Sequence, residues 1–208
     1  MWRFVPTPLA WVALQLHLVF LGTSSLLWNL LALPLYWLLP ERAGRTLGRQ
    51  GVAWLYGSFW RLATATGMLR LDSEALRPLR HEPGLVVVAN HPSMLDAMLV
   101  VARVPRGICI MRAGLMQNPF LGAGARLARY IRNDPPRGMI RSAVRNLQAG
   151  GQLVLFPEGT RTVTPPINPF RPGMTLMAHM AQVPIQTVII ESASPYLGKG
   201  WPDRKSVV

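Results

Sequence analysis

The chain has 208 residues, half of them hydrophobic, which is enough for one well-buried domain with a short appendage and too short for two catalytic domains of ordinary size. Its 22 Lys and Arg residues against 9 Asp and Glu residues give a formal net charge of +13, so anionic partners are expected. Charge by itself does not distinguish nucleic acid, an acidic membrane surface, coenzyme A and an acidic carrier protein. The single cysteine, Cys109, excludes an intrachain disulfide and fits a reduced, cytosol-facing compartment.

The N-terminal segment is strongly apolar. Residues 4–40 contain no Asp, Glu, Lys or Arg, and as one helix they would be about 55 Å long, whereas one crossing of a bilayer core needs only about 30 Å. The excess predicts either one span followed by an interfacial segment or a re-entrant pair of helices broken near residues 22–25. A cleaved signal peptide is disfavoured, because the run is too long and Arg3 is the only basic residue before it.

The next segment combines basic and aromatic side chains at helical spacing. It contains Arg42, Arg45 and Arg49, followed by Trp54, Tyr56, Phe59 and Trp60. This pattern predicts either a helix lying in the lipid headgroup zone or an ordinary helix packed on the domain. We therefore expect residues 1–65 to form a membrane-associating helical segment at the cell inner membrane. The arginines favour a cytoplasmic location for residues 66–208, the expected catalytic domain.

Beyond Gly84, short apolar runs alternate with amphipathic ones. The predicted strands are 85–89, 107–111, 153–156 and 185–190, and the predicted helices are 93–103, 119–130, 138–148 and 173–181. Ser93 is the expected N-cap of the first of these helices, and Cys109 is expected to be an inert thiol in the core. The alternation indicates an α/β fold with a largely parallel central sheet flanked by helices. The tail, residues 198–208, has no periodicity.

Two polar clusters directly follow predicted strands. In the first, His91 leaves the end of a strand and Asp96 lies five positions later, at the start of a helix. Active sites of open α/β sheets form at this end of the strands. An imidazole there can accept a hydroxyl proton while a carboxylate behind it orients the ring. A helix-capping histidine beside a first-turn aspartate explains the same pair equally well.

The second cluster is Phe156-Pro157-Glu158-Gly159-Thr160-Arg161. Gly159 allows backbone amides to approach a ligand, Thr160 offers a hydroxyl, and Arg161 can bind a phosphate through two hydrogen bonds. Glu158 and Arg161 could also form a plain surface ion pair.

Taken together, the clusters resemble the glycerolipid acyltransferase family, typified by 1-acylglycerol-3-phosphate acyltransferase. That family has an N-H-x-x-x-x-D block followed further along the chain by an F-P-E-G-T-R block, and both are present here in that order. The resemblance implies that His91 is the general base and Asp96 its partner. It also implies that Glu158, Gly159, Thr160 and Arg161 bind the acceptor.

Two further positions are carried over from this resemblance. A family arginine that contacts the substrate phosphate is matched by Arg132, although the match falls one place early. An apolar-Pro pair before the last strand is matched at Pro184, which is expected to shape the acyl or acceptor pocket. The poor match at Arg132 leaves the acceptor headgroup open between lysophosphatidic acid and an amino-acid-headed lysolipid.

The remaining charged residues carry weaker signals. Arg137, Arg141 and Arg145 recur every four residues and form one helix face, which is interpreted as a solvated or lipid-facing stripe in preference to a docking site for acyl carrier protein. The histidines other than His91 are scattered, so no metal site is predicted.

The leading hypothesis is an O-acyltransferase that moves a fatty acyl group from acyl carrier protein or coenzyme A to a lysophospholipid. The expected acceptor is 1-acyl-sn-glycerol-3-phosphate, the expected partners are membrane lipids and the thioester, and no other cofactor is expected. A lyso-ornithine-lipid acyltransferase and a truncated, inactive family member are the alternatives. A non-catalytic nucleic-acid-binding protein is disfavoured, because aromatic residues are sparse in the arginine-rich middle of the chain.

Overall fold

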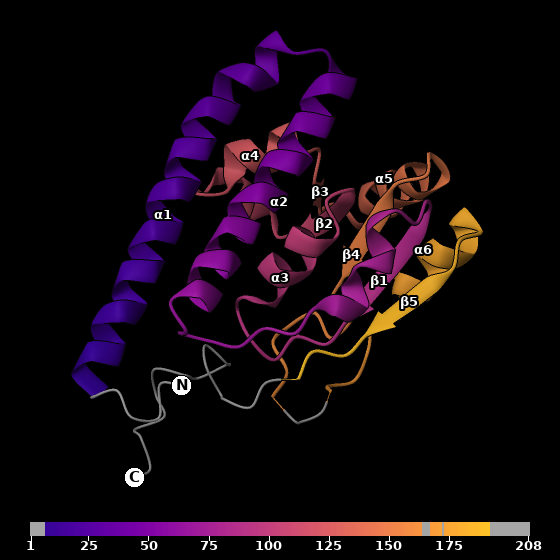
Figure 1. The fold of residues 1–208 in the computed structure, drawn as a ribbon. Coiled ribbons are helices and arrows are strands. Elements are labelled where there is room, and N and C mark those ends of the chain that lie inside the picture. Colours follow the sequence, from indigo (N-terminus) through magenta and orange to yellow (C-terminus); the bar gives the residue numbers. More distant parts are fainter. Residues whose placement is uncertain (1–6, 164–166, 172, 192–208) are drawn as a thin grey trace.

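Figure 1 shows the computed structural model, which describes residues 7–163, 167–171 and 173–191. The predicted aperiodic tail lies outside these residues. The helices are α1 (Thr7–Leu38), α2 (Glu41–Ala65), α3 (Asp96–Arg103), α4 (Gly122–Leu127), α5 (Pro136–Gln148) and α6 (Gly173–Ala181). The strands are β1 (Leu85–Ala89), β2 (Gly107–Met111), β3 (Ile131–Arg132), β4 (Gln152–Leu155) and β5 (Ile185–Val188). Short 3-10 helices are η2 (Glu74–Leu76), η3 (Pro78–Arg80) and η4 (Ala113–Gln117).

The strands form one parallel sheet in the order β3-β2-β4-β1-β5, which confirms the predicted α/β class. Alternate side chains of β1 point to opposite faces of the sheet. Val87 packs with Val52 of α2 and Val100 of α3, whereas Val86 packs with Leu147 of α5. Burial on both faces explains why this strand is a continuous apolar run rather than an alternating one.

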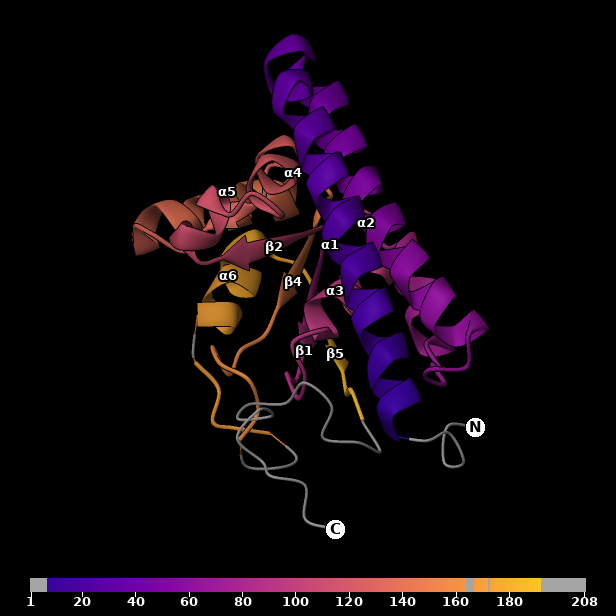
Figure 2. The ribbon, with the colours of Figure 1, turned by 90° about the vertical axis from the view of Figure 1, so that its left-hand side faces the viewer.

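The helices make two layers around the sheet. The α1–α2 hairpin and α3 cover one face, and α5 and α6 cover the other, as the two views at right angles show (Figures 1 and 2). The turn between α1 and α2 lies at the end of the molecule opposite to that toward which β5 points (Figure 1). The carboxyl ends of the strands, where His91 emerges, therefore face away from this turn.

Helix α1 is continuous from Thr7 to Leu38, so the second of the two alternatives, a pair of helices broken near residues 22–25, is wrong. The chain reverses instead at Leu39 and Pro40, before α2 begins. Packing of α1 along α2 and α4 outweighs the weak helix propensity of Gly22 and the serines after it. By length and composition, residues Trp11–Leu38 could cross a membrane.

Helix α2 packs on the domain and so follows the second of its two predicted interpretations. Phe59 and Trp60 are buried beside Leu95 and Leu99, whereas Trp54 is exposed. Arg49 donates hydrogen bonds to the carbonyls of Ala128 and Arg106, outside its own helix. The basic and aromatic residues of this segment thus mainly join the hairpin to the sheet domain.

Several predicted boundaries are wrong at their ends. The helix predicted over 119–130 is only six residues long, because Asn118 starts a turn and Arg129 adopts a left-handed backbone with φ of 58°. Helix α3 begins at Asp96 rather than at Ser93. Helix α5 begins two residues before the predicted start, β4 lies one residue earlier in the chain than predicted, and β5 ends two residues before the predicted end. Contacts distant in the sequence decide these ends, which local patterns do not report.

Candidate active site

His91 and Asp96 form a hydrogen-bonded pair at the carboxyl end of β1. Nδ1 of His91 lies 3.1 Å from Oδ2 of Asp96, and the two side chains are 21% and 5% exposed. A carboxylate can only accept, so Nδ1 carries the proton and Nε2 presents a lone pair. No hydrogen-bond partner of Nε2 occurs among the described residues. The ring is therefore oriented with one accepting nitrogen free for a ligand.

The turn before α3 explains why Asp96 reaches the imidazole. Oδ2 of Asp96 also accepts the backbone N–H of Ser93 at 2.6 Å, and the Ser93 hydroxyl accepts the N–H of Leu95 at 3.2 Å. These bonds hold residues 93–95 in a turn, so the helix starts later than predicted and Ser93 is not its N-cap. Asp96 therefore has two roles: it orients His91 and it closes the loop that carries it.

Glu158 is buried, not part of a surface ion pair. Its Oε1 accepts the backbone N–H of His91 at 2.9 Å and the hydroxyl of Thr162 at 2.7 Å. Its Oε2 accepts the backbone N–H of Asn168 at 2.9 Å. With both oxygens occupied by the protein, this carboxylate ties the second cluster to the loop of His91. The acceptor-binding role implied by the family resemblance is not visible in these contacts.

The loop of the second cluster lies directly against His91. Thr162 donates its N–H to the carbonyl of His91 at 2.7 Å, and the rings of His91 and Phe156 lie 4.5 Å apart between centroids. Gly159 has φ of +67°, and a Cβ there would lie 2.6 Å from Nε of Arg171. The left-handed backbone conformation favours glycine here, and the absence of a Cβ leaves room for the side chain of Arg171. Sequence reasoning missed Phe156 as a ring neighbour and Arg171 altogether.

Asn90 and Asn168 are further site residues that the sequence did not single out. Asn90 exchanges two hydrogen bonds with the backbone of Ile190, at 3.0 and 2.6 Å, and so joins the end of β1 to the chain after β5. The Asn168 side chain donates to the carbonyl of Arg161 at 3.2 Å and accepts the N–H of Val163 at 3.0 Å. Asn90 is the first residue of the first family motif, so its position could have marked it as a site residue. Asn168 lies outside both motifs, and no sequence pattern marked it.

The other predicted site residues are dispersed. Thr160 and Arg161 are half-buried in the loop beside His91. Arg132 is exposed at the end of β3, pairs with Asp134 at 3.1 Å, and lines a cavity that contains neither His91 nor Glu158. Pro184 is exposed at the amino end of β5, and its carbonyl accepts the N–H of Val86 at 3.1 Å. The structure therefore does not bring Arg132 or Pro184 to the His91 site.

Two other titratable features bear on the chemistry. Burial raises the pKa of the Cys109 thiol to about 12, so this side chain stays protonated near neutral pH, as predicted for an inert core thiol. Within the described part of the chain, no group of three His, Cys, Asp or Glu side chains could hold a metal ion. The groups available for chemistry at this site are thus the imidazole of His91, the carboxylate of Asp96 and the loop that contains Gly159.

Residues 70–191, more than half of the chain, match the family model described as Acyltransferase, and the chain therefore belongs to the acyltransferase family. A 1-acyl-sn-glycerol-3-phosphate acyltransferase of Limnanthes alba is 32% identical over 112 residues, covering 50% of this chain and 40% of that protein. The lysophospholipid acyltransferase LPCAT4 of Mus musculus is 31% identical over 133 residues, covering 60% and 24%. The chain thus spans less than half the length of either relative.

A solved structure shares the fold. The crystal structure of the 1-acyl-sn-glycerophosphate acyltransferase PlsC from Thermotoga maritima superposes with a TM-score of 0.60 at 24% identity, covering 85% of this chain and 72% of that chain. The family match and the relatives named above confirm the resemblance to glycerolipid acyltransferases, and the solved structure shows that the fold is shared.

Proposed function

We propose that the protein moves a fatty acyl group from a thioester to the free hydroxyl of a lysophospholipid, with 1-acyl-sn-glycerol-3-phosphate as acceptor and phosphatidic acid as product. The observation that carries the proposal is the His91–Asp96 pair at a strand end. Nε2 of His91 bonds to none of the described residues, and the loop of the second family motif is held against the ring. The relatives named above, which carry acyltransferase activity in their names, support the same reaction class.

In the proposed mechanism, Nε2 of His91 removes the proton of the acceptor hydroxyl while the oxygen attacks the thioester carbonyl. Asp96 holds the tautomer and stabilises the imidazolium that forms. When the tetrahedral intermediate collapses, the C–S bond breaks and the proton on Nε2 passes to the leaving sulfur. The step needs no acyl-enzyme, and the thioester of coenzyme A or acyl carrier protein is the only co-substrate.

Acceptor binding is assigned to the loop of Gly159, Thr160 and Arg161. Arg161 would bind the lysolipid phosphate, because a guanidinium donates paired hydrogen bonds to phosphate oxygens. Glu158 contributes indirectly in this proposal, by fixing the loop against the backbone of His91.

We also propose that α1 attaches the protein to the inner membrane, with the α/β domain in the cytoplasm. Support comes from the large apolar side chains that α1 exposes along its length, from Leu9 to Leu38. Such an apolar face is more stable in lipid than in water.

The test is acyl transfer to 1-acylglycerol-3-phosphate in detergent micelles, comparing the unmodified chain with His91→Ala and offering both thioesters. Loss of the general base is expected to lower kcat by a factor of about 10² to 10⁴, whereas the lost hydrogen bond to Asp96 should cost only about 1–3 kcal/mol of stability and leave the protein folded. His81→Ala is the matched control, because His81 is an exposed histidine after η3.

Three outcomes decide the proposal. Transfer that His91→Ala abolishes and His81→Ala preserves supports it. Transfer that survives His91→Ala contradicts the general-base role. If transfer fails with both thioesters, the same assay with lyso-ornithine lipid separates a wrong headgroup from an inactive protein.

A further inference from the structure

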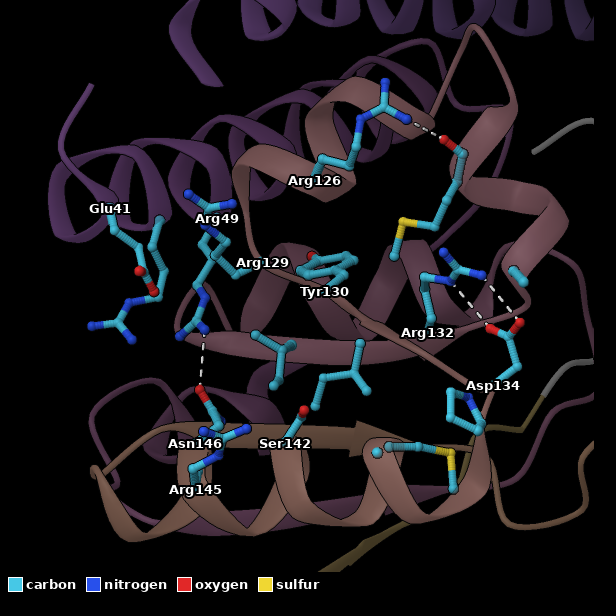
Figure 3. A pocket seen from close by; sticks show the side chains of 18 of the residues that line it. Glu41, Arg49, Arg126, Arg129, Tyr130, Arg132, Asp134, Ser142, Arg145 and Asn146 are labelled. Carbon is cyan, nitrogen blue, oxygen red and sulfur yellow. Dashed lines mark hydrogen bonds and ion pairs between the residues drawn. The ribbon is translucent and has the colours of Figure 1, made fainter. Parts of the chain in front are cut away.

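The cavity lined by Arg132 has a volume of about 960 Å³ and lies away from His91, between the N-terminal half of α2, α4, β3 and α5 (Figure 3). Six arginines line it, and the carboxylates among the described residues of its lining are Glu41 and Asp134. The six are Arg45, Arg49, Arg126, Arg129, Arg132 and Arg145. We call this cavity the arginine groove.

Most of the positive charge in the arginine groove is not neutralised. The ion pairs in the described part of the chain are Arg77–Glu74, His91–Asp96 and Arg132–Asp134, so five of the six groove arginines have no carboxylate partner there. Arg49 is the clearest case, because it donates only to neutral oxygens, including Oδ1 of Asn146 across the groove (Figure 3). Burial and the nearby charge of Arg45 lower the pKa of Arg49 to about 10. A bound anion would offset both the loss of solvation of the Arg49 guanidinium and its repulsion by Arg45.

Arg129 and Tyr130, two adjacent residues in the lining, adopt arrangements that are unfavourable in free energy. Arg129 has a left-handed backbone with φ of 58°, and its guanidinium lies 4.5 Å from the ring centroid of Tyr36. Nε of Arg129 and the hydroxyl of Tyr130 are both buried, and neither has a hydrogen-bond partner among the described residues. Strained backbone and unpartnered polar groups of this kind concentrate at binding sites.

The end of the groove that contains Arg49 lies beyond the reach of the phosphate of the acceptor. Arg49 bonds to the carbonyl of Arg106, just before β2 begins, whereas His91 follows the end of β1. Two strand spacings amount to about 10 Å and the five residues of β1 to about 16 Å, so the two sites are roughly 19 Å apart. In 1-acylglycerol-3-phosphate the phosphate is only a few bonds from the free hydroxyl. It cannot reach Arg49 while that hydroxyl is at His91.

A coenzyme A thioester has the opposite shape. Its diphosphate and its sugar phosphate are separated from the thioester by the long pantetheine arm. The groove runs from Arg132, at the carboxyl end of β3, to Arg49 and Asn146 near the amino ends of β2 and β4. A donor could thus have its thioester at the carboxyl edge, near His91, and its phosphates in the groove.

We propose that the arginine groove binds the phosphates of a coenzyme A thioester. The inference rests on the proposed acyl transfer and names its donor. A concave cavity walled by arginines on three helices fits a compact polyphosphate, whereas the acidic surface of a carrier protein would need an exposed, convex basic face.

The test removes two groove charges and compares a matched pair outside the groove. Arg45→Gln/Arg145→Gln changes α2 and α5 inside the groove, and Arg42→Gln/Arg141→Gln removes the same charge from exposed positions of the same helices outside its lining. Binding of coenzyme A itself is measured by calorimetry on the full chain in detergent. KM and kcat are measured with palmitoyl-coenzyme A, palmitoyl-pantetheine and a palmitoyl carrier protein.

The groove pair is expected to weaken coenzyme A binding and raise KM for palmitoyl-coenzyme A by roughly tenfold per arginine, with kcat nearly unchanged. KM for palmitoyl-pantetheine, which has no phosphate, and for the lysolipid should stay constant, and the control pair should behave like the unmodified chain. Equal effects of the two pairs, or a rise in the lysolipid KM instead, would overturn the proposal. So would an effect confined to the carrier protein thioester.

The calorimetric measurement separates the two proposals. If the chain transfers no acyl group but binds coenzyme A in a way that only the groove pair weakens, the proposed activity fails and the groove assignment stands. If transfer is normal and the Arg45→Gln/Arg145→Gln variant binds coenzyme A as tightly as the unmodified chain, the groove assignment alone fails.

Discussion

The buried carboxylate of Glu158 joins the two loops that make the candidate site. Its oxygens accept hydrogen bonds from the backbone of His91, the hydroxyl of Thr162 and the backbone of Asn168. All three partners are donors, so a carboxylate, which has only acceptors, satisfies every one of them. A glutamate at this position of the family motif is therefore explained by the structure alone, without a contact between Glu158 and the substrate.

Glu158→Gln tests this role. The amide group would place donors opposite at least one existing donor, so we expect a loss of about 1–3 kcal/mol in unfolding free energy, which corresponds to a melting temperature lower by about 2–4 °C per kcal/mol. Activity should fall as well, because the backbone of His91 loses a fixed contact. Thermal unfolding and kcat are the measurements, with Glu82→Gln, at an exposed glutamate, as the control. Unchanged stability in Glu158→Gln would contradict the assignment.

At the scale of elements, the α1–α2 hairpin is closely fitted to the α/β domain. Asn29 of α1 donates to the carbonyl of Phe120 at 2.7 Å and accepts the N–H of Gly124 at 2.8 Å. A Cβ on Gly48 of α2 would collide with the backbone of Ala128, just after α4. A polar residue in an apolar helix and a glycine in a helix interior are both unfavourable locally, and here each permits the close approach of α4.

Gly48→Ala is therefore expected to destabilise the protein, although alanine is the better helix former. Overpacking against backbone costs about 1–3 kcal/mol and exceeds the gain of about 1 kcal/mol in helix propensity. Gly22→Ala is the control, because a Cβ at Gly22 meets no atom within 4 Å and should stabilise α1 slightly. Thermal unfolding in detergent measures both. A stabilised Gly48→Ala variant would mean that the hairpin does not pack as described.

At the scale of the whole molecule, the most exposed large apolar side chains gather on α1. Trp37 and Leu38, at the end of α1 next to the turn, are 79% and 75% exposed. On the opposite side of the sheet, α5 presents Arg137 and Arg141 to solvent. In the described part of the chain, the outer side of the hairpin is thus an apolar face suited to insertion into a lipid layer.

The prediction is that Trp37→Gln/Leu38→Gln weakens binding to lipid vesicles. Each large apolar side chain transferred from water contributes about 1.5–3 kcal/mol, so the double variant should bind at least tenfold more weakly. Co-sedimentation with phosphatidylglycerol-containing vesicles measures this. Met180→Gln, at an exposed methionine of α6, should change binding little. Equal binding by all three proteins would argue against membrane attachment through α1.

The amino-acid sequence was enough to predict the alternation of strands and helices, the parallel sheet and the two motifs at strand ends, because these depend on short apolar runs and residues close together in the chain. It also correctly paired His91 with Asp96, which lie only five positions apart in the chain. Tertiary structure alone decided that α1 continues through Gly22, that Arg132 lies away from His91, and that Glu158 is enclosed by donors. It also decided that arginines from α2, α4 and α5 share one groove. These features arise from contacts between segments far apart in sequence, and no local pattern encodes the distance between such segments.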